Sequence, residues 1–202
     1  QYSLQLPQVK IKRIATDKTI KFLLELSDGN LIESVLMHNK YGMSLCITSQ
    51  VGCNMGCSFC ASGLLGKKRD LMVGEFISQI MVANQYIKKN IASAKVVTNV
   101  VIMGIGEPFD NYEKFKKAVT ILKEENGLAI ASRKITVSTS GLSPQIINFA
   151  NDNININLAI SLHAPNDEMR SKIMKVNKVY DIKNLMGAVD YYLERSNKRI
   201  TF

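Results

Sequence analysis

Residues 43–60 read MSLCITSQVGCNMGCSFC, an apolar stretch that predicts a β-strand, followed at once by three cysteines. Cys53, Cys57 and Cys60 stand in the spacing C-x3-C-x2-C. Three thiolates can bind three irons of a four-iron cluster, whereas a ferredoxin-type cluster takes four cysteines. The fourth iron is then open to a ligand that the protein does not supply. The stretch therefore predicts a strand that ends at a reactive iron–sulfur site.

Other uses of three cysteines fit the sequence less well. A structural zinc site takes four ligands, commonly as two separated pairs, and the one remaining cysteine, Cys46, lies too near on the predicted strand. Neither His38 nor His163 stands in paired-ligand spacing. Disulfides belong to oxidising compartments, and the N-terminus shows no secretory signal pattern. Cysteines that only fill a core would not need three within eight positions.

The composition is that of a basic globular protein. The 202 residues predict one domain, or one with a small appendage, and 46% hydrophobic residues allow a sizeable core. No apolar run is long enough to cross a membrane. The net charge of +9 favours a polyanionic partner such as nucleic acid, with a merely basic protein as the alternative. Four cysteines without an export signal predict a reducing cytoplasm.

The pattern of apolar residues changes near residue 40. Three short apolar runs, the last two joined by a Ser-Asp-Gly-Asn turn, predict a small antiparallel β extension over residues 1–40. Residues 41–202 alternate strand and helix, which predicts a parallel sheet covered by helices. The predicted strands are residues 9–14, 20–26, 31–37, 43–50, 96–103, 135–139, 156–162 and 199–202; the predicted helices are 74–89, 111–125, a short one opened by Ser143 and Pro144, and 181–194.

The helix faces and caps follow from spacing. Met81 is expected on the buried face of the first helix and Leu193 on that of the last. Asn111 is expected to cap the second helix and Ser143 the third.

The predicted fold class is α/β, a partial (β/α) barrel behind the antiparallel extension. In such barrels the chemistry lies at the carboxyl ends of the strands. Here the strand ends carry the cysteines, then Met-Gly-Ile-Gly-Glu-Pro at residues 103–108, Ser-Thr-Ser-Gly at 138–141 and Ser-Leu-His-Ala at 161–164. These ends predict one pocket. A flavodoxin-like open sheet obeys the same rule and is the alternative.

Each pocket residue also has an ordinary structural reading. Gly106 suits a turn with positive φ. Beside a cluster, the backbone amides of residues 104–107 and the Glu107 carboxylate would also suit a ligand with an ammonium group. Ser138 could cap the helix that follows. Ser161 and His163 are two positions apart on their predicted strand, so both side chains could point to the same side. A lone histidine, however, is commonly structural.

Two residues on the preceding strands are further candidates. Cys46 alternates with Leu45 and Ile47 and lies on the same side of the predicted strand as Ser44 and Thr48. It is interpreted either as a buried small residue or as a thiol with a redox role near the cluster. Glu33 follows the turn and could be a solvated carboxylate.

With these residues assembled, the sequence resembles the radical S-adenosylmethionine (SAM) superfamily. Residues 45–53 (LCITSQVGC), 103–108 (MGIGEP), 133–141 (RKITVSTSG) and 161–168 (SLHAPNDE) are similar to the RlmN-type adenine C2-methyltransferases, which act on 23S ribosomal RNA and on some tRNA. The resemblance runs from about residue 6 to residue 202.

The resemblance implies a role for each residue. Cys53, Cys57 and Cys60 would bind a [4Fe-4S] cluster whose open iron chelates the amino and carboxyl groups of S-adenosylmethionine. Cys46 would resolve a covalent protein–RNA intermediate, and Glu33 matches the position of the proton acceptor. The cofactor would be held by Gly106 and Glu107 at its amino group and elsewhere by Ser138, Ser161, Leu162 and His163.

The family mechanism also implies partners. Adenine C2 is not nucleophilic, so the family methylates a second cysteine and adds the derived carbon radical to C2; an external one-electron donor such as flavodoxin is implied. The family carries that cysteine near its C-terminus, after the position of Phe202. We therefore expect this sequence to be the interior of a longer enzyme, inactive alone. The alternatives are the related adenine C8 rRNA methyltransferase and a non-catalytic iron–sulfur module that binds RNA.

Overall fold

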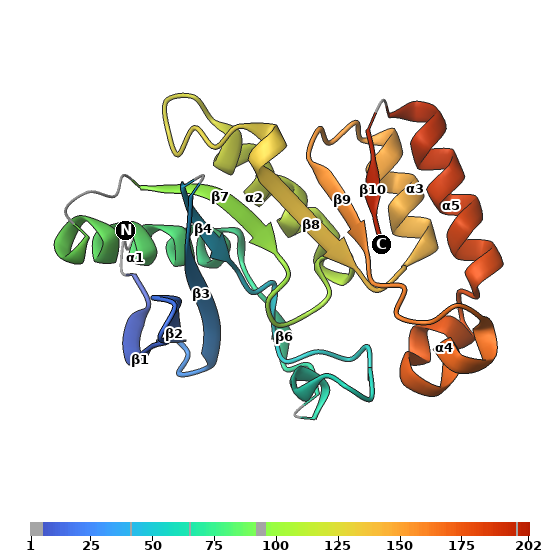
Figure 1. Cartoon of the computed structure of the whole chain (residues 1–202), viewed down its shortest axis with the longest axis horizontal. Coiled ribbons are helices and arrows are strands. Elements are labelled where there is room, and N and C mark those ends of the chain that lie inside the picture. Colours follow the sequence, from blue (N-terminus) through green and yellow to red (C-terminus); the bar gives the residue numbers. More distant parts are fainter. Residues whose placement is uncertain (1–5, 41, 65, 92–95, 197) are drawn as a thin grey trace.

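The computed structural model describes residues 6–40, 42–64, 66–91, 96–196 and 198–202. Within them, eight strands form one mixed sheet in the order β1-β2-β3-β4-β7-β8-β9-β10 (Figure 1). The strands are β1 (Gln8–Ile14), β2 (Ile20–Glu25), β3 (Leu31–Asn39), β4 (Gly42–Cys46), β7 (Val97–Ile102), β8 (Ile135–Thr139), β9 (Asn157–Ile160) and β10 (Ile200–Thr201). A separate antiparallel pair, β5 (Gln50–Val51) and β6 (Arg69–Asp70), flanks the cysteine loop, residues 53–60.

The helices cover the parallel part of this sheet, except for one short helix that lies beyond the strand ends (Figure 1). They are α1 (Val73–Asn90), α2 (Tyr112–Lys123), α3 (Ser143–Asn151), α4 (Asp167–Ile173) and α5 (Ile182–Arg195), with short 3-10 helices η1 (Ala61–Gly63), η2 (Pro108–Asn111), η3 (Ser132–Lys134) and η4 (Lys175–Lys178). None of the described helices combines the length and apolar character that a membrane crossing requires.

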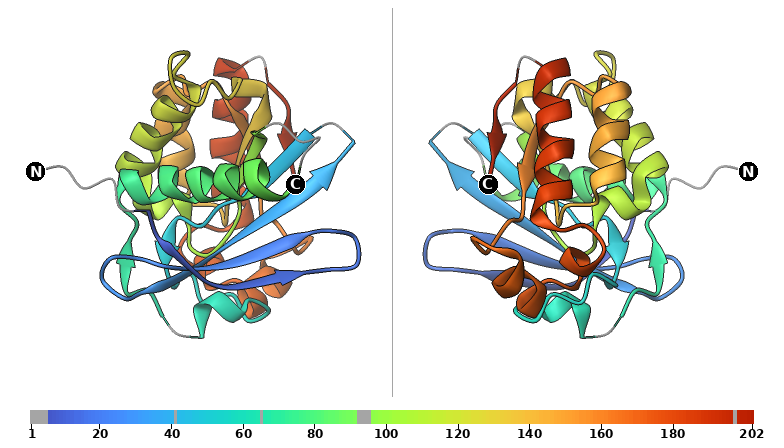
Figure 2. Two further views of the ribbon diagram at one scale, coloured as in Figure 1. Left: turned by 90° about the vertical axis from the view of Figure 1, so that its left-hand side faces the viewer. Right: turned by 90° about the vertical axis from the view of Figure 1, so that its right-hand side faces the viewer.

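The strand order decides between the two α/β alternatives. From β4 through β7, β8 and β9 to β10 the strands are parallel and follow chain order. Right-handed crossovers between strands in chain order place the connecting helices on one face, and α2, α3 and α5 stand side by side there (Figure 2). A flavodoxin-like sheet reverses its strand order and has helices on both faces. The predicted partial barrel is confirmed.

The antiparallel strands adjoin this barrel in the same sheet. β1, β2 and β3 pair as expected, and β3 pairs antiparallel with β4. Alternation along β2 buries Phe22, whose ring packs edge-on against Tyr86 of α1 with centroids 5.3 Å apart. The division into an extension of residues 1–40 and a core of 41–202 stays a prediction; residues 1–5 and 41 lie outside the described part.

Two helix faces differ from the expectation. Met81 is 41% exposed and Leu193 is 42% exposed. Tyr192 takes the inward position on α5 instead, because its ring stacks on Phe149 of α3 with centroids 5.7 Å apart. The neighbouring helix, rather than the apolar spacing alone, decides which positions face inward.

Asn111 holds the N-cap position of α2 as predicted but without a capping hydrogen bond, and the predicted cap of α3 was wrong. The Asn111 side chain instead donates to the carbonyl oxygens of Ser49 at 3.0 Å and Leu71 at 2.9 Å. Ser143 is already helical, after Leu142. The short α4 was not predicted, because seven residues are too few to show a helical period.

Candidate active site

A cavity of about 290 Å³ opens where the parallel strands end. Cys53, Cys57 and Cys60 line one side. The other side is formed by residues 103–108 after β7, by residues 138–140 at the end of β8, and by Ser161 and His163 after β9. The strand-end argument therefore located the cavity.

The three thiols are free and partly buried. Burial raises the pKa of the Cys53 and Cys57 thiols, and the neighbouring cysteines raise that of Cys57 further because like charges would gather. Among the described residues, no three His, Cys, Asp or Glu side chains converge closely enough to hold a single metal ion. Three thiols on one side of the cavity are the soft donors that an iron–sulfur cluster takes. Their binding of such a cluster stays a prediction.

Close backbone approach explains the glycines beside the cysteine loop. Gly52 has φ +76°, and a Cβ there would overlap the carbonyl oxygen of Gly66. Gly106 has φ +101°, and a Cβ there would lie 2.5 Å from Cβ of Gln50. Larger residues would force apart the segments that enclose the cavity.

The Glu107 carboxylate is almost fully buried, at 3% exposure. Its Oε1 accepts from the Phe109 N–H at 3.0 Å and its Oε2 accepts from the Ser140 N–H at 2.7 Å. Burial raises its pKa, although these hydrogen bonds oppose the shift. The carboxylate thus joins the end of β7 to the end of β8. A contact from Glu107 to a ligand's ammonium group stays a prediction.

The ends of β8 and β9 meet through two serines. The hydroxyls of Ser138 and Ser161 are 3.2 Å apart. The His163 ring lies against Phe59 of the cysteine loop, with centroids 4.9 Å apart. Ser161 and His163 both line the cavity, whereas Leu162 packs against the apolar core. Ser161 and His163 thus lie on the cavity side as expected, but β9 ends at Ile160 and His163, with φ +59°, is placed by a turn rather than by strand alternation.

Cys46 and Glu33 do not line this cavity, but they share one face of the sheet. Cys46 of β4 pairs with Val35 of β3, and Glu33 lies two positions from Val35, on the same face. Burial raises the pKa of the Cys46 thiol, partly offset by a hydrogen bond from the backbone of Met103, which lines the cavity. The Glu33 Oε1 lies 2.7 Å from Nζ of Lys21. Cys46 therefore adjoins the cavity's edge.

Two buried polar residues near the cavity were missed in the sequence. Gln50 accepts from the Glu107 N–H at 2.8 Å and donates to Asp70 and Asp110, each at 2.8 Å. Arg170 of α4 is fully buried beneath the strand ends. No local pattern marks either residue. The partners of Gln50 are 20 or more positions away, and those of Arg170 lie 7–30 positions away on other elements.

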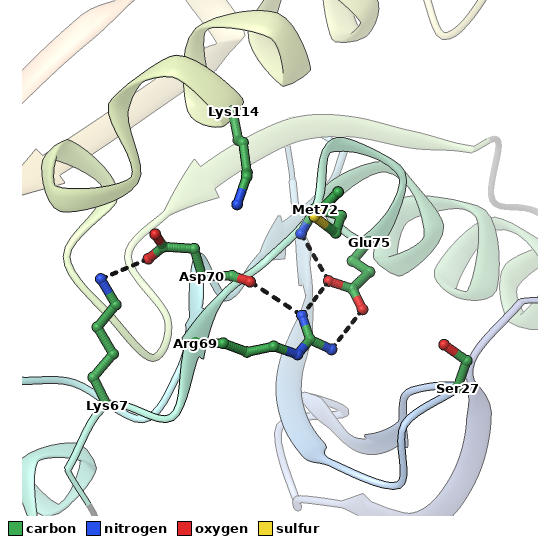
Figure 3. A pocket seen from close by; sticks show the side chains of 7 residues that line it. All are labelled: Ser27, Lys67, Arg69, Asp70, Met72, Glu75 and Lys114. Atoms are coloured by element: carbon green, nitrogen blue, oxygen red, sulfur yellow. Dashed lines mark hydrogen bonds and ion pairs between the residues drawn. The ribbon is translucent and has the colours of Figure 1, made fainter.

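A second hollow, of about 560 Å³, lies beside the N-terminus of α1 (Figure 3). Arg69 donates to both carboxylate oxygens of Glu75 at 2.8 Å and to Asp28 at 2.7 Å. Lys67 forms an ion pair of 2.8 Å with Asp70. These cations already have carboxylate partners, so they offer little charge to an anion and instead hold the segment after the cysteine loop against α1.

Comparison with known proteins adds to this geometry. Residues 47–202 match the family model described as Radical SAM superfamily. A protein of Listeria welshimeri named "Probable dual-specificity RNA methyltransferase RlmN" is 55% identical over 188 residues, which are 93% of this chain and 51% of that protein. A protein of Shouchella clausii with the same name is 54% identical over 192 residues, 95% of this chain and 54% of its own length.

A solved structure is similar over nearly the whole chain. The crystal structure of a radical SAM methyltransferase from Sphaerobacter thermophilus superimposes with a TM-score of 0.93 at 42% identity, covering 98% of this chain and 58% of that one. The present chain thus spans about half the length of the curated relatives that it matches.

Proposed function

Because this chain belongs to the radical SAM superfamily, we propose that it forms the cofactor-binding core of an RlmN-type RNA methyltransferase, which methylates C2 of adenine in 23S rRNA and tRNA. The observation that carries the proposal is the shared cavity, in which three cysteine thiols face glycine, serine and histidine residues from three strand ends. The names of the similar Listeria and Shouchella proteins support the reaction class.

The cofactors of this family are a [4Fe-4S] cluster and S-adenosylmethionine. Cys53, Cys57 and Cys60 hold the cluster in this proposal. The residues that receive S-adenosylmethionine are Gly106, Glu107, Ser138, Ser161, Leu162 and His163. When bound, the cluster and S-adenosylmethionine supply the one-electron chemistry that ordinary methyl transfer to an unreactive adenine carbon lacks.

The chain's own residues then release the product. Glu33 accepts the proton that leaves adenine C2. In the covalent intermediate, the sulfur of a second cysteine is bonded through a carbon to the RNA. The Cys46 thiolate attacks this sulfur, so that an S–S bond forms between the two cysteines and the bond from the sulfur to that carbon breaks. The electron pair of that bond passes to the released carbon, which takes up a proton. All four cysteines of this sequence already have roles, so the second cysteine is not one of them.

RNA as the partner agrees with the net charge of +9. An external electron donor such as flavodoxin and a cytoplasmic location belong to the same proposal.

Analysis of modified bases tests the function. The full-length protein, reconstituted with iron and sulfide without oxygen, is incubated with S-adenosylmethionine, dithionite and a 23S rRNA transcript or tRNA. Digestion and mass spectrometry should show 2-methyladenosine and 5′-deoxyadenosine. 8-Methyladenosine would assign the enzyme to the C8 branch. An intact cluster with neither product would favour a non-catalytic RNA-binding module.

A further inference from the structure

Arg170 is a buried cation whose hydrogen bonds go to backbone carbonyls at the strand ends. Its side chain has 0% exposure. One Nη donates to the carbonyl of Ser140 at 2.6 Å and to that of Ser161 at 3.4 Å, while Nε donates to Leu162 at 3.2 Å. The other Nη donates to Oδ1 of Asn177 at 2.7 Å. The guanidinium therefore ties the end of β8 to the segment after β9.

This burial is unfavourable by itself. Among the described residues, no carboxylate oxygen is hydrogen-bonded to the Arg170 guanidinium, and burial lowers its pKa. A buried charge is tolerated where its donors are all satisfied, and an apolar side chain of similar volume is commonly no less stable. Stability alone is thus a poor reason for an arginine at this position, whereas its planar set of donors fits a role in fixing several carbonyls at once.

The segment that Arg170 holds is strained. His163 has φ +59°, which a residue with a Cβ rarely adopts. The Ala164 N–H donates to the Leu162 carbonyl at 2.8 Å, which closes a γ-turn around His163. Turns of this positive-φ kind are rare and persist only where the surroundings enforce them. The same Leu162 carbonyl accepts from Nε of Arg170, so the arginine supports the turn that directs His163 into the cavity.

The segment around Arg170 also contacts the cysteine loop. The N–H of Ser58 donates to the carbonyl of Ile173, the last residue of α4, at 2.9 Å. Met174 follows directly and lines the cavity. The segment from α4 to η4 is thereby fixed to both sides of the cavity, the cysteines on one and the strand ends on the other.

We propose that Arg170 is a positioning residue for S-adenosylmethionine: it fixes the turn at His163 and the carbonyls of Ser140, Ser161 and Leu162, and through α4 it sets their position relative to the cysteine loop. The inference rests on the proposed function, since it assigns the cavity to this cofactor. Arg170 itself does not touch the ligand. Its loss should therefore weaken the binding of S-adenosylmethionine more than it disturbs the cluster.

Two substitutions test the role. Arg170→Lys keeps the charge and Arg170→Gln keeps a hydrogen-bond donor, but neither can reach all the carbonyls. After anaerobic reconstitution, both variants should retain about four irons per chain. Their affinity for S-adenosylmethionine, measured by titration calorimetry, should fall about 10–100-fold, as for other residues that orient ligands of a metal site. The change that S-adenosylmethionine causes in the electron paramagnetic resonance spectrum of the reduced cluster should weaken.

A matched control separates positioning from stability. Val189→Ala removes buried volume from α5 at a residue that does not line the cavity, so it should lower the melting temperature yet leave the affinity and the spectrum unchanged. Wild-type affinity and spectrum in both Arg170 variants would overturn this inference alone. Equal losses of affinity in Val189→Ala would also overturn it, in favour of general destabilisation. A wild-type protein whose cluster forms but binds no S-adenosylmethionine would overturn the proposed function together with it.

Discussion

At the scale of single residues, Cys46 is the thiol that we propose to resolve the covalent intermediate. It lies on β4 in the same face as Glu33, and the backbone of Met103 donates to its sulfur beside the cavity. In the active enzyme, Cys46→Ala should leave the cluster intact and accumulate a covalent protein–RNA adduct, because no thiolate remains to break the C–S bond. A shifted band on a denaturing gel measures this adduct. Burial raises the pKa of the wild-type thiol, so adduct release should quicken as pH rises above 7.

Cys57→Ala is the control for this experiment, since it should lose iron and form no adduct. Wild-type turnover by Cys46→Ala would reduce Cys46 to a packing residue.

At the scale of elements, ion pairs fasten the β2–β3 turn to α1. Arg69 links Asp28 of the turn to Glu75 of α1, and its hydrogen bond holds the pKa of Asp28 well below the usual range. A carboxylate with a lowered pKa stabilises the fold above its unfolded pKa of about 3.9, and this stabilisation is lost as pH falls. Asp28→Asn should therefore lower the free energy of unfolding at pH 7, by roughly 0.2–1 kcal/mol because the pair is exposed.

Urea unfolding of both proteins across acidic pH checks this prediction. The difference should start to shrink as the pH falls below about 4, should be lost only as the pH approaches the lowered pKa of folded Asp28, and should shrink in high salt. Asp17→Asn is a matched control, because Asp17 accepts from the Thr19 N–H as Asp28 does from the Asn30 N–H, but within the described part of the chain it forms no ion pair with an arginine. A deficit in Asp28→Asn that is independent of pH would contradict the electrostatic explanation.

At the scale of the whole molecule, the excess of positive charge should dominate binding to RNA. The chain has 26 Lys and Arg residues against 17 Asp and Glu residues. With about three phosphate contacts, affinity for an RNA hairpin should fall roughly 20–40-fold as salt rises from about 50 to about 200 mM. Fluorescence anisotropy measures this slope. Tight binding to one hairpin that does not change over this range would instead indicate base-specific contacts within these residues.

Much of the fold could be predicted from local patterns. The alternation of strand and helix, the turn at residues 27–30 and the three-cysteine spacing depend on residues close together in the chain, so they can be read from it. The predictions that Met81 and Leu193 lie on buried helix faces were wrong, because burial at these positions depends on the neighbouring helix. The choice of the partial barrel over a flavodoxin-like open sheet required the order of the strands, which the sequence left undecided.

By itself, the sequence determined which residues could form a site: the cysteines, the strand-end glycines and serines, and His163. Only the tertiary structure decided how they are held. Both carboxylate oxygens of Glu107 accept hydrogen bonds from backbone N–H groups, one of them 33 positions away in the sequence. Arg170 joins carbonyls at the ends of two strands. A buried charge takes whatever donors or acceptors the folded chain brings within hydrogen-bonding distance, and contacts between residues so distant in sequence exist only once the sheet has assembled.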